Sequence, residues 1–198
     1  MKVTGAILAG GKSTRMKYNK AFAKLGEEVI IEMILKQFKE LFNKTIIISN
    51  EPHLYEHLGI DIYTDIYPGL GPISGIHSAL TNSTDEVIFA LACDMPFVPP
   101  DLIKYMLARI TGYDTVVART NNFYQATSAV YHKSCLPILI NCLENDKLKT
   151  TLIFRELNAR VLDEPEVEPF GKLEDIFFNI NDENALEYAQ ELAGRFWK

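Results

Sequence analysis

The chain has 198 residues, of which 47% are hydrophobic and 23% are charged. This length and composition fit one α/β domain with a sizeable core. The formal net charge of -6 argues against general binding of nucleic acids or anionic membranes, so we expect neither as a partner.

The sequence predicts neither secretion nor a membrane span. The apolar stretch over residues 1–8 is too short for a signal peptide, and no segment has the roughly 18 apolar residues that a transmembrane helix needs. The three cysteines, Cys93, Cys135 and Cys142, form no C-x-x-C pair. An odd and sparse cysteine count favours a reducing compartment, so we expect a cytoplasmic protein.

The first 110 residues alternate between predicted strands and predicted helices. Apolar and β-branched runs predict strands over residues 3–8, 45–49, 60–64 and 87–93. Apolar residues at helical spacing, and prolines near helix starts, predict helices over residues 29–42, 52–58, 73–80 and 99–110. This alternation predicts an α/β fold with a mainly parallel sheet and helices on both faces.

The later part of the chain predicts a mixed continuation of the sheet. Strands are expected over residues 114–118, 126–132 and 160–162. Helices are expected over residues 134–143 with Ser134 as the cap, over 150–157, and from Asp182 to just before Gly194. The stretch 164–172 is rich in proline and glutamate, and we expect it to be an exposed loop.

Four of the predicted loops bring polar or glycine residues to one edge of the sheet. These loops follow the carboxyl ends of strands, where open α/β sheets bind their ligands near a topological switch point. In chain order, the loops carry Gly10-Gly11, Asn50, Asp65 and Asp94. We therefore expect a binding site that is shared among several strand ends.

The most distinctive motif is LAGGKSTRM over residues 8–16, followed by Lys20. Its two adjacent glycines let the backbone turn sharply and bring N–H groups close to a bulky anion. The first 26 residues carry a charge of +6 and no acidic residue, so the remainder carries -12. The spacing does not fit a P-loop, and a simple tight turn is the alternative. The cations that follow favour a site for a polyphosphate.

Asp94 follows the most apolar predicted strand and precedes Met95-Pro96. A carboxylate at such a place is costly without a partner, and Mg²⁺ commonly binds one or two carboxylates together with substrate phosphates. A turn-forming or helix-capping aspartate is the alternative. The neighbouring cationic loop favours the metal site.

Asp65 and Asn50 are also polar residues at predicted strand ends. A carboxylate can accept both N–H donors on the pairing edge of guanine, so Asp65 is a candidate for base recognition. Capping of the loops by Asp and Asn is an equally good interpretation.

Several segments together resemble a known family. The motif over residues 8–16 with Lys20 resembles the signature of nucleotidyltransferases that couple a nucleoside triphosphate to a phosphorylated acceptor. Within that group, residues 71–76 (GPISGI), 93–97 (CDMPF) and 178–182 (FNIND) resemble the molybdenum cofactor guanylyltransferases. The chain departs from the family pattern at Lys17 and Asn19, where Gly and Asp are frequent, and at Gln125-Ala126, where Gln-Pro is frequent.

The resemblance implies a Rossmann-like α/β/α sandwich in three layers, with a mixed C-terminal part of the sheet. It implies one domain over residues 1–198, with a nucleotide-binding half (1–110) and an acceptor-binding half (111–198). The implied reaction transfers GMP from Mg-GTP to the terminal phosphate of molybdopterin and releases pyrophosphate. GTP, molybdopterin and Mg²⁺ are then the ligands, and other cofactor-biosynthesis proteins and recipient molybdoenzymes are candidate partners.

The resemblance also implies roles for individual residues. Contacts with GTP would come from Leu8, Ala9, Gly10, Gly11, Lys20, Asn50, Asp65 and Asp94. Arg15, Lys20 and Asp94 would be catalytic: the cations would offset charge on the phosphates, and Asp94 would hold the metal. Asn179 and Asn181 would bind the acceptor, although the sequence alone slightly favours them as caps for the helix that starts near Asp182.

The sequence leaves two other functions open. One is a related nucleotidyltransferase that uses CTP or another phosphorylated acceptor, and the choice of base distinguishes it. The other is a non-catalytic protein that binds a nucleotide or a pterin. The presence of both Lys20 and Asp94 argues against this second alternative.

Overall fold

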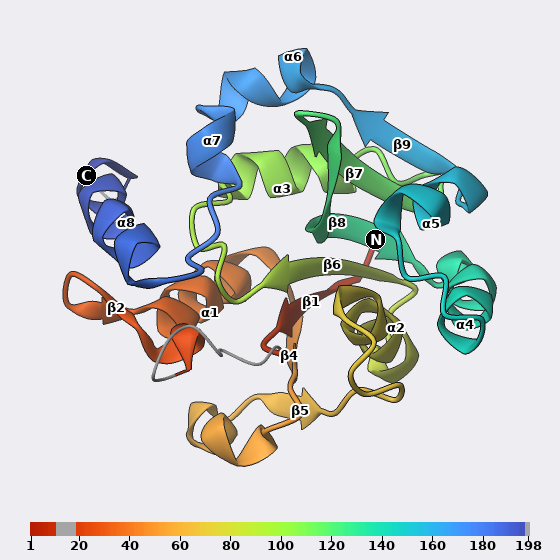
Figure 1. The fold of residues 1–198 in the computed structure, drawn as a ribbon, viewed down its shortest axis with the longest axis horizontal. Helices are drawn as coiled ribbons and strands as arrows, with labels where there is room; N and C mark the ends of the chain where they lie inside the picture. The colour runs from red at the N-terminus through yellow and green to blue at the C-terminus, as the bar shows by residue number, and fades with distance from the viewer. Residues whose placement is uncertain (11–18, 197–198) are drawn as a thin grey trace.

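The structure, a computed structural model, describes residues 1–10 and 19–196 of the chain. Seven strands form one sheet in the order β5-β4-β1-β6-β8-β7-β9 (Figure 1). Their bounds are β1 Val3–Leu8, β4 Lys44–Ile48, β5 Asp61–Tyr63, β6 Val87–Ala92, β7 Thr115–Thr120, β8 Phe123–His132 and β9 Ala159–Leu162. β8 runs antiparallel to both β6 and β7, and the other neighbouring pairs are parallel. The expected α/β class, with a mixed C-terminal part, is confirmed.

Helices cover both faces of this sheet. The longer ones are α1 Ile30–Leu41, α2 Pro72–Asn82, α3 Pro100–Leu107, α4 Leu136–Glu144, α5 Thr150–Glu156 and α8 Glu183–Phe196. Successive side chains of a strand point to opposite faces. Gly5 faces α1 and Leu8 faces α2, so α1 and α2 lie on opposite sides of β1. α4 packs beside α2, and α5 packs against α4.

The order of the strands creates a switch point next to β1. From β1 the chain builds β4 and β5 on one side, then returns to add β6 on the other side. The central strands supply fully buried side chains such as Ile7, Ile47 and Phe89, as expected for strands covered on both faces. Because the strand order switches between β1 and β6, the loops after these two strands lie at the place where α/β sheets bind ligands.

Gly5 permits close packing of α1 on β1. A Cβ atom at this position would lie 2.5 Å from ring carbons of both Phe38 and Phe42. We expect Gly5→Ala to lower the free energy of unfolding by about 1–3 kcal/mol, since the two rings must move. Denaturant unfolding measures this change. Gly194→Ala is the control, because no atom lies near the added Cβ and alanine favours the helix by up to about 1 kcal/mol. Equal stability of wild type and Gly5→Ala would contradict the packing argument.

Several local expectations are wrong, each for a physical reason. The stretch 164–172 is not a loop but contains α6 Glu164–Val167 and the 3₁₀ turn η5 Glu168–Phe170, each with a proline in its first turn. Gly194 does not end the last helix but lies inside α8, at an exposed position.

Two further expectations need correction. Residues 52–58 form two 3₁₀ turns, η2 Pro52–Leu54 and η3 Glu56–Leu58, rather than one helix. Ser134 does not cap a helix through its hydroxyl, which donates to Asp114 instead, while its backbone N–H donates to His132 in the turn η4 Lys133–Cys135.

The remaining elements lie before α1 and before the C-terminal tail. The 3₁₀ turn η1 Lys20–Phe22 leads into a two-stranded hairpin, β2 Lys24–Leu25 and β3 Glu28–Val29, which the sequence analysis did not predict. The short helix α7 Leu173–Ile176 precedes the extended tail that enters α8. Among the residues described, no helix is both long and apolar enough to cross a membrane.

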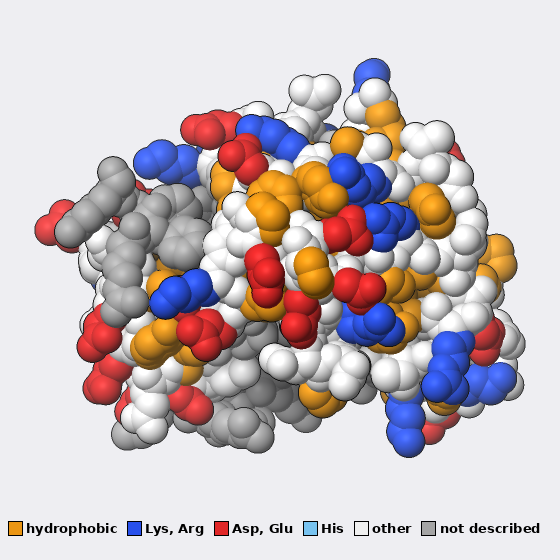
Figure 2. Space-filling view, turned by 90° about the horizontal axis from the view of Figure 1, so that it is seen from above, with side chains coloured by type: hydrophobic (Ala, Val, Ile, Leu, Met, Phe, Trp, Pro, Cys, Tyr) orange, Lys and Arg blue, Asp and Glu red, His pale blue; other side chains and the backbone are white. Residues whose placement is uncertain are grey.

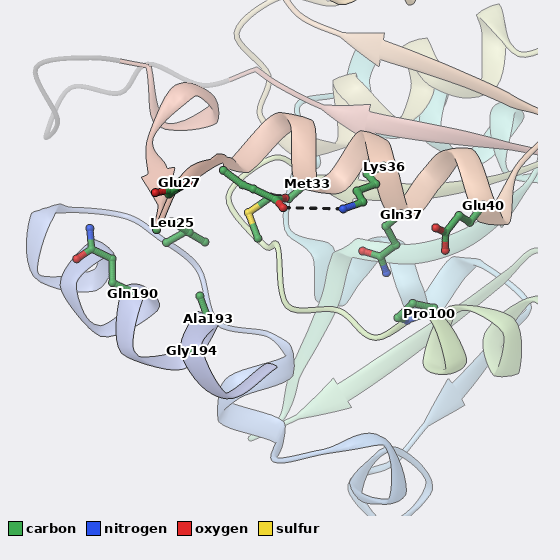
Figure 3. Close-up of a pocket in the computed structure, with 12 residues that line it drawn as sticks. Leu25, Glu27, Met33, Lys36, Gln37, Glu40, Pro100, Gln190, Ala193 and Gly194 are labelled. Carbon is green, nitrogen blue, oxygen red and sulfur yellow. Dashed lines mark ion pairs between the residues drawn. The ribbon is translucent and has the colours of Figure 1, made fainter. Parts of the chain in front are cut away.

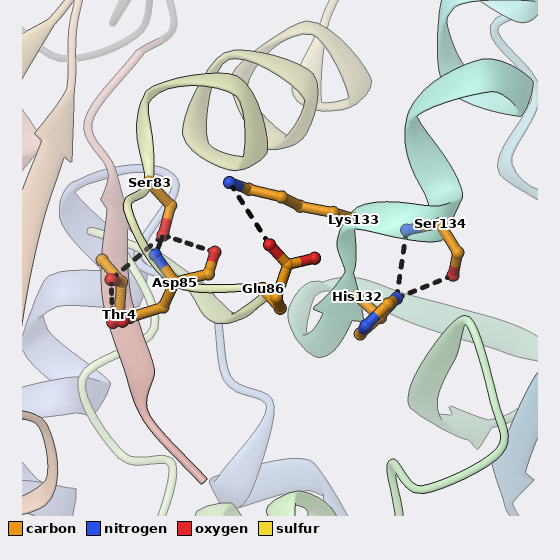
Figure 4. Close-up of polar contacts among 7 residues, drawn as sticks. All are labelled: Thr4, Ser83, Asp85, Glu86, His132, Lys133 and Ser134. Atoms are coloured by element: carbon orange, nitrogen blue, oxygen red, sulfur yellow. Dashed lines mark hydrogen bonds and ion pairs between the residues drawn. The ribbon is translucent and has the colours of Figure 1, made fainter.

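The amino edge of the sheet is closed by polar contacts (Figure 4). The Thr4 hydroxyl donates to a carboxylate oxygen of Asp85 at 2.7 Å, and the Ser83 Oγ lies 3.0 Å from the Thr4 hydroxyl and accepts the N–H of Asp85. The Lys133 ammonium lies 4.0 Å from Glu86 at the same edge. These contacts lie at the edge opposite to the strand ends that carry Asn50, Asp65 and Asp94.

The surface over α6 and the β7–β8 hairpin carries interspersed acidic and basic side chains (Figure 2). Arg119 forms an ion pair with Asp163 at 2.8 Å, and Arg160 forms one with Glu166 at 2.5 Å. The cations of these pairs are thus engaged by neighbouring carboxylates rather than presented as a basic patch.

Candidate active site at the carboxyl edge

The loops that follow β1, β4 and β6 are joined by backbone hydrogen bonds. The N–H of Cys93, just after β6, donates to the carbonyl of Leu8 at 3.0 Å. The N–H of Ala9, just after β1, donates to the carbonyl of Ile48 at 2.9 Å. These bonds extend the parallel pairing by one residue and set the start of the glycine loop beside the turn that carries Asp94.

Lys20, Asp94 and Asn181 converge at this edge from three distant parts of the chain. The Lys20 ammonium donates to the Asn181 side-chain oxygen at 2.8 Å and lies 3.7 Å from a carboxylate oxygen of Asp94. The Lys20 and Asp94 side chains are only 17% and 20% exposed. The N–H of Ile180 donates to the carbonyl of Asp94 at 3.0 Å, which fixes the tail on the Asp94 turn.

Burial dominates the electrostatics of the Asp94 turn. It raises the pKa of the Asp94 carboxyl, and the nearby Lys20 ammonium opposes that rise only in part. Burial, with the negative charge of Asp94 adding to it, raises the pKa of the Cys93 thiol to about 12. Cys93 is thus a neutral thiol at physiological pH and not an activated nucleophile.

Asn50 and Asp65 form a second polar cluster at the same edge. The Asn50 side-chain amide donates to Asp65 Oδ2 at 2.8 Å, and the Asn50 side-chain oxygen accepts the N–H of Asp65 at 3.0 Å. Asp65 Oδ1 is buried and has no hydrogen-bond partner among the described residues. A Cβ at Gly75 would lie 3.7 Å from this oxygen and 3.4 Å from Leu8. An unmet carboxylate oxygen beside Leu8 is suited to accept an N–H from a ligand.

Four other predicted site residues are Gly10, Gly11, Arg15 and Asn179. Gly10 is exposed, and a Cβ there would meet no atom within 4 Å, so its packing does not require glycine. Gly11 and Arg15 lie outside the described residues. The Asn179 amide donates to the carbonyl of Phe177 at 3.2 Å and does not join the Lys20 cluster.

The capping interpretation of Asn181 is wrong. Asp182 caps α8, because its carboxylate accepts the N–H of Ala185 at 2.9 Å. The Asn181 side chain instead accepts from Lys20. Its role toward an acceptor stays a prediction.

Sequence reasoning missed two residues beneath the site, Asn19 and Tyr55. Asn19 caps η1 by accepting the N–H of Ala21 at 3.0 Å, and its amide donates to the Tyr55 hydroxyl at 2.9 Å. The capping preference of Asn was a usable signal for the first bond. No local pattern identified Tyr55, a fully buried side chain that follows a short 3₁₀ turn.

A cavity of about 630 Å³ lies between the β2–β3 hairpin, α1 and α8 (Figure 3). Its lining includes none of the predicted site residues and contains the weak ion pair between Lys36 and Glu28, at 3.9 Å. Within the described ranges, no group of three His, Cys, Asp or Glu side chains could hold a metal ion. A metal at Asp94 stays a prediction.

Open α/β sheets bind their ligands at the switch point, and the Lys20–Asp94 pair lies there. The comparisons agree with this fold class. The chain belongs to the MobA-like NTP transferase domain family, whose model matches residues 5–161. Its activity is therefore nucleotidyl transfer.

Relatives of similar length indicate which group of nucleotidyltransferases the chain resembles. The chain is 39% identical over 190 residues to a probable molybdenum cofactor guanylyltransferase of Clostridium perfringens, covering 94% of this chain and 96% of that protein. It is 34% identical to a protein of the same name from Pelotomaculum thermopropionicum, covering 100% and 98%. A crystal structure of molybdopterin-guanine dinucleotide biosynthesis protein A from Archaeoglobus fulgidus matches with a TM-score of 0.83 and 24% identity, covering 97% and 99%. The resemblance to molybdenum cofactor guanylyltransferases is confirmed.

Proposed function

We propose that the chain transfers GMP from GTP to the terminal phosphate of molybdopterin, forming molybdopterin guanine dinucleotide and pyrophosphate. The names of its relatives, which align over nearly the whole chain, support these substrates. The observation that carries the chemistry is the Lys20–Asp94 pair at the switch point of the sheet. It offers a cation to phosphates and a carboxylate to a metal ion at one place.

The reaction needs positioning and charge neutralisation more than proton transfer. An oxygen of the acceptor phosphate attacks the α-phosphorus of GTP in line, and the bond from that phosphorus to the bridging oxygen breaks as pyrophosphate leaves. The acceptor phosphate is already ionised near neutral pH, so no general base is required. Backbone N–H groups near Gly10, together with Lys20 and Arg15, would bind the phosphates and offset the charge that builds up.

The donor set at Asp94 fits Mg²⁺. This metal prefers oxygen ligands and commonly takes one or two carboxylates, with phosphate oxygens and water completing its shell. Asp94 supplies such a carboxylate, and the burial that raises its pKa supports the proposal that a cation binds there. When bound, Mg²⁺ would supply charge neutralisation on the phosphates. Asp94 would hold it, with Lys20 beside it.

Asp65 is proposed to recognise guanine through its unmet carboxylate oxygen. We expect Asp65→Asn to weaken GTP binding by about 10- to 100-fold, because a hydrogen bond to a charged group contributes about 1.5–3 kcal/mol. Titration calorimetry with GTP and with inosine triphosphate, which lacks the exocyclic amine, measures the effect. The preference of wild type for GTP should disappear in the variant. Asp61→Asn is the control, since that side chain is exposed and pairs with Lys44 at 3.2 Å. An unchanged preference in Asp65→Asn would exclude this role.

The acceptor is proposed to bind in the half formed by residues 111–198, with Asn181 and Asn179 at the boundary with the nucleotide-binding half, residues 1–110. We expect Asn181→Ala to lower transfer to molybdopterin about tenfold while GTP affinity changes little. The variant loses the oxygen that holds the Lys20 ammonium, yet Asp182 still caps α8. Transfer rate, GTP affinity and melting temperature are measured separately. Asn184→Ala is the control, since Asn184 is exposed in the first turn of α8. A joint fall of all three would show that Asn181 is structural.

The direct test incubates the purified protein with each Mg-NTP and molybdopterin and measures pyrophosphate. Release of pyrophosphate with GTP and molybdopterin, but with no other nucleotide, supports the proposed function. Release with CTP would indicate a sister specificity. Binding of GTP without any release would indicate a non-catalytic protein.

A further inference from the structure

Tyr55 is a fully buried tyrosine whose hydroxyl lies beneath the proposed phosphate site. This hydroxyl accepts a hydrogen bond from the Asn19 amide at 2.9 Å and lies 3.5 Å from the carbonyl oxygen of Ala9. Ala9 begins the loop after β1, and Asn19 directly precedes Lys20. One buried hydroxyl therefore touches the chain at two places that flank the proposed site.

Asn19 connects this hydroxyl to the backbone of Lys20. Its side-chain oxygen accepts the N–H of Ala21, which caps η1 at the turn where Lys20 is the first residue. The carbonyl of Asn19 also accepts the N–H of Phe22 at 3.0 Å, and the Phe22 ring lies 5.1 Å from the Tyr55 ring. The first turn of η1 is thus fixed to Tyr55 by both a hydrogen bond and a ring contact.

The direction of these hydrogen bonds is determined by their donors. The Asn19 amide donates to the Tyr55 oxygen, so the phenolic proton is available to be donated toward the carbonyl oxygen of Ala9. Burial raises the pKa of Tyr55 above its ordinary value. The hydroxyl therefore stays protonated at physiological pH and can be donor and acceptor at once.

We propose that Tyr55 is a positioning residue for Lys20, acting through Asn19, and that it ties the turn of Lys20 to the loop after β1. This inference rests on the proposed role of Lys20 toward the phosphates. A lysine side chain has four flexible carbon–carbon torsions, so the place of its ammonium depends on where its backbone begins. A displacement of about 1 Å at a reacting centre can cost about 100-fold in rate. No atom of Tyr55 needs to touch the substrate.

The kinetic test uses Tyr55→Phe, with Tyr131→Phe as a matched control. Tyr131 is also buried, and its hydroxyl donates to the carbonyl of Ala126 at 2.7 Å, in β8. Both variants lose one buried hydroxyl and should show similar losses in melting temperature. Well below that temperature, we expect Tyr55→Phe to lower kcat about tenfold with little change in GTP affinity, and Tyr131→Phe to leave kcat unchanged. In a Lys20→Ala background, Tyr55→Phe should cause no further loss. An additive loss, or an equal loss in the control, would overturn the inference.

Two substitutions of Asn19 distinguish the effect of its hydrogen bond with Tyr55 from the effect of simple packing. In Asn19→Asp, the carboxylate can accept from both Ala21 and the Tyr55 hydroxyl, so the connection is kept and most of kcat should remain. In Asn19→Leu, both bonds are lost, and kcat should fall as in Tyr55→Phe. Equal activity of the Asp and Leu variants would contradict the role of this hydrogen bond.

Hydrogen–deuterium exchange provides a readout that needs no substrate. We expect the amides of Ala21, Phe22 and Ala23 to exchange at least tenfold faster in Tyr55→Phe and Asn19→Leu, and at the wild-type rate in Tyr131→Phe. Unchanged exchange in Tyr55→Phe would refute the inference whatever the activity. Absence of GMP transfer to molybdopterin by the wild type would refute the proposed function, and the exchange rates would still decide the role of Tyr55.

Discussion

Asp94→Asn is expected to fold normally and to lose at least about 100-fold in the rate of GMP transfer. Removing one preorganised charge contact at a reacting centre commonly costs about 100- to 1,000-fold. The variant should fold because burial already disfavours the charged carboxylate, and because the carbonyl of residue 94 can still accept from Ile180. Single-turnover rates at saturating GTP measure the loss.

The metal dependence of GTP binding identifies the cause of that loss. Wild type should bind GTP more tightly as Mg²⁺ is added, and the Asn variant should lose most of this dependence. Asp101→Asn is the control, since Asp101 is exposed and pairs only with Lys104, at 3.1 Å, among the ion pairs found. Turnover at the wild-type rate by Asp94→Asn in the presence of Mg²⁺ would rule out the metal role.

Lys20→Ala is expected to lower kcat/KM for GTP more than 100-fold. This corresponds to a rise of about 3 kcal/mol in the activation free energy. Lys24→Ala should change it less than about twofold. Both cations belong to the same basic N-terminal region, but Lys20 is largely buried against Asp94 and Asn181, whereas Lys24 is exposed on β2. Salt screens the exposed charge and leaves the buried contact largely intact.

Measurements at low and high ionic strength make this comparison decisive. The small effect of Lys24→Ala should vanish at high salt, and the large effect of Lys20→Ala should persist. Lys20→Met is a useful second variant, since it keeps an apolar stem of similar length and separates lost packing from lost charge. Equal effects of Lys20→Ala and Lys24→Ala would mean that the region acts only through its general electrostatic field.

The main features of the fold were predictable because they depend on local patterns. The run from Val3 to Leu8 is apolar and β-branched, and it is a strand with those bounds. The expectation that Asn50 and Asp65 lie close together follows from the parallel direction of β4 and β5, and the two side chains form two hydrogen bonds. Polar residues at the ends of parallel strands are brought together by topology alone.

Other features depend on contacts that no local pattern encodes. The insertion of β8 between β6 and β7 is set by packing between distant segments, so the sequence could indicate a mixed sheet but not its order. The contact of Asn181 with Lys20 depends on the path of the tail across the Asp94 turn. The capping preference of Asn suggested another role for this residue, and only the three-dimensional path of the chain decides between them.

The hydrogen bond between Lys20 and Asn181 joins residues that are 161 positions apart in the chain. Closing a loop of this length costs entropy, so the contact depends on the sheet that brings the two segments together. During synthesis, the first three strands of the sheet can therefore pair before the tail that holds the lysine exists. If Lys20 acts on the phosphates as proposed, a nascent chain would lack the contact that holds its ammonium until the tail has folded against Asp94.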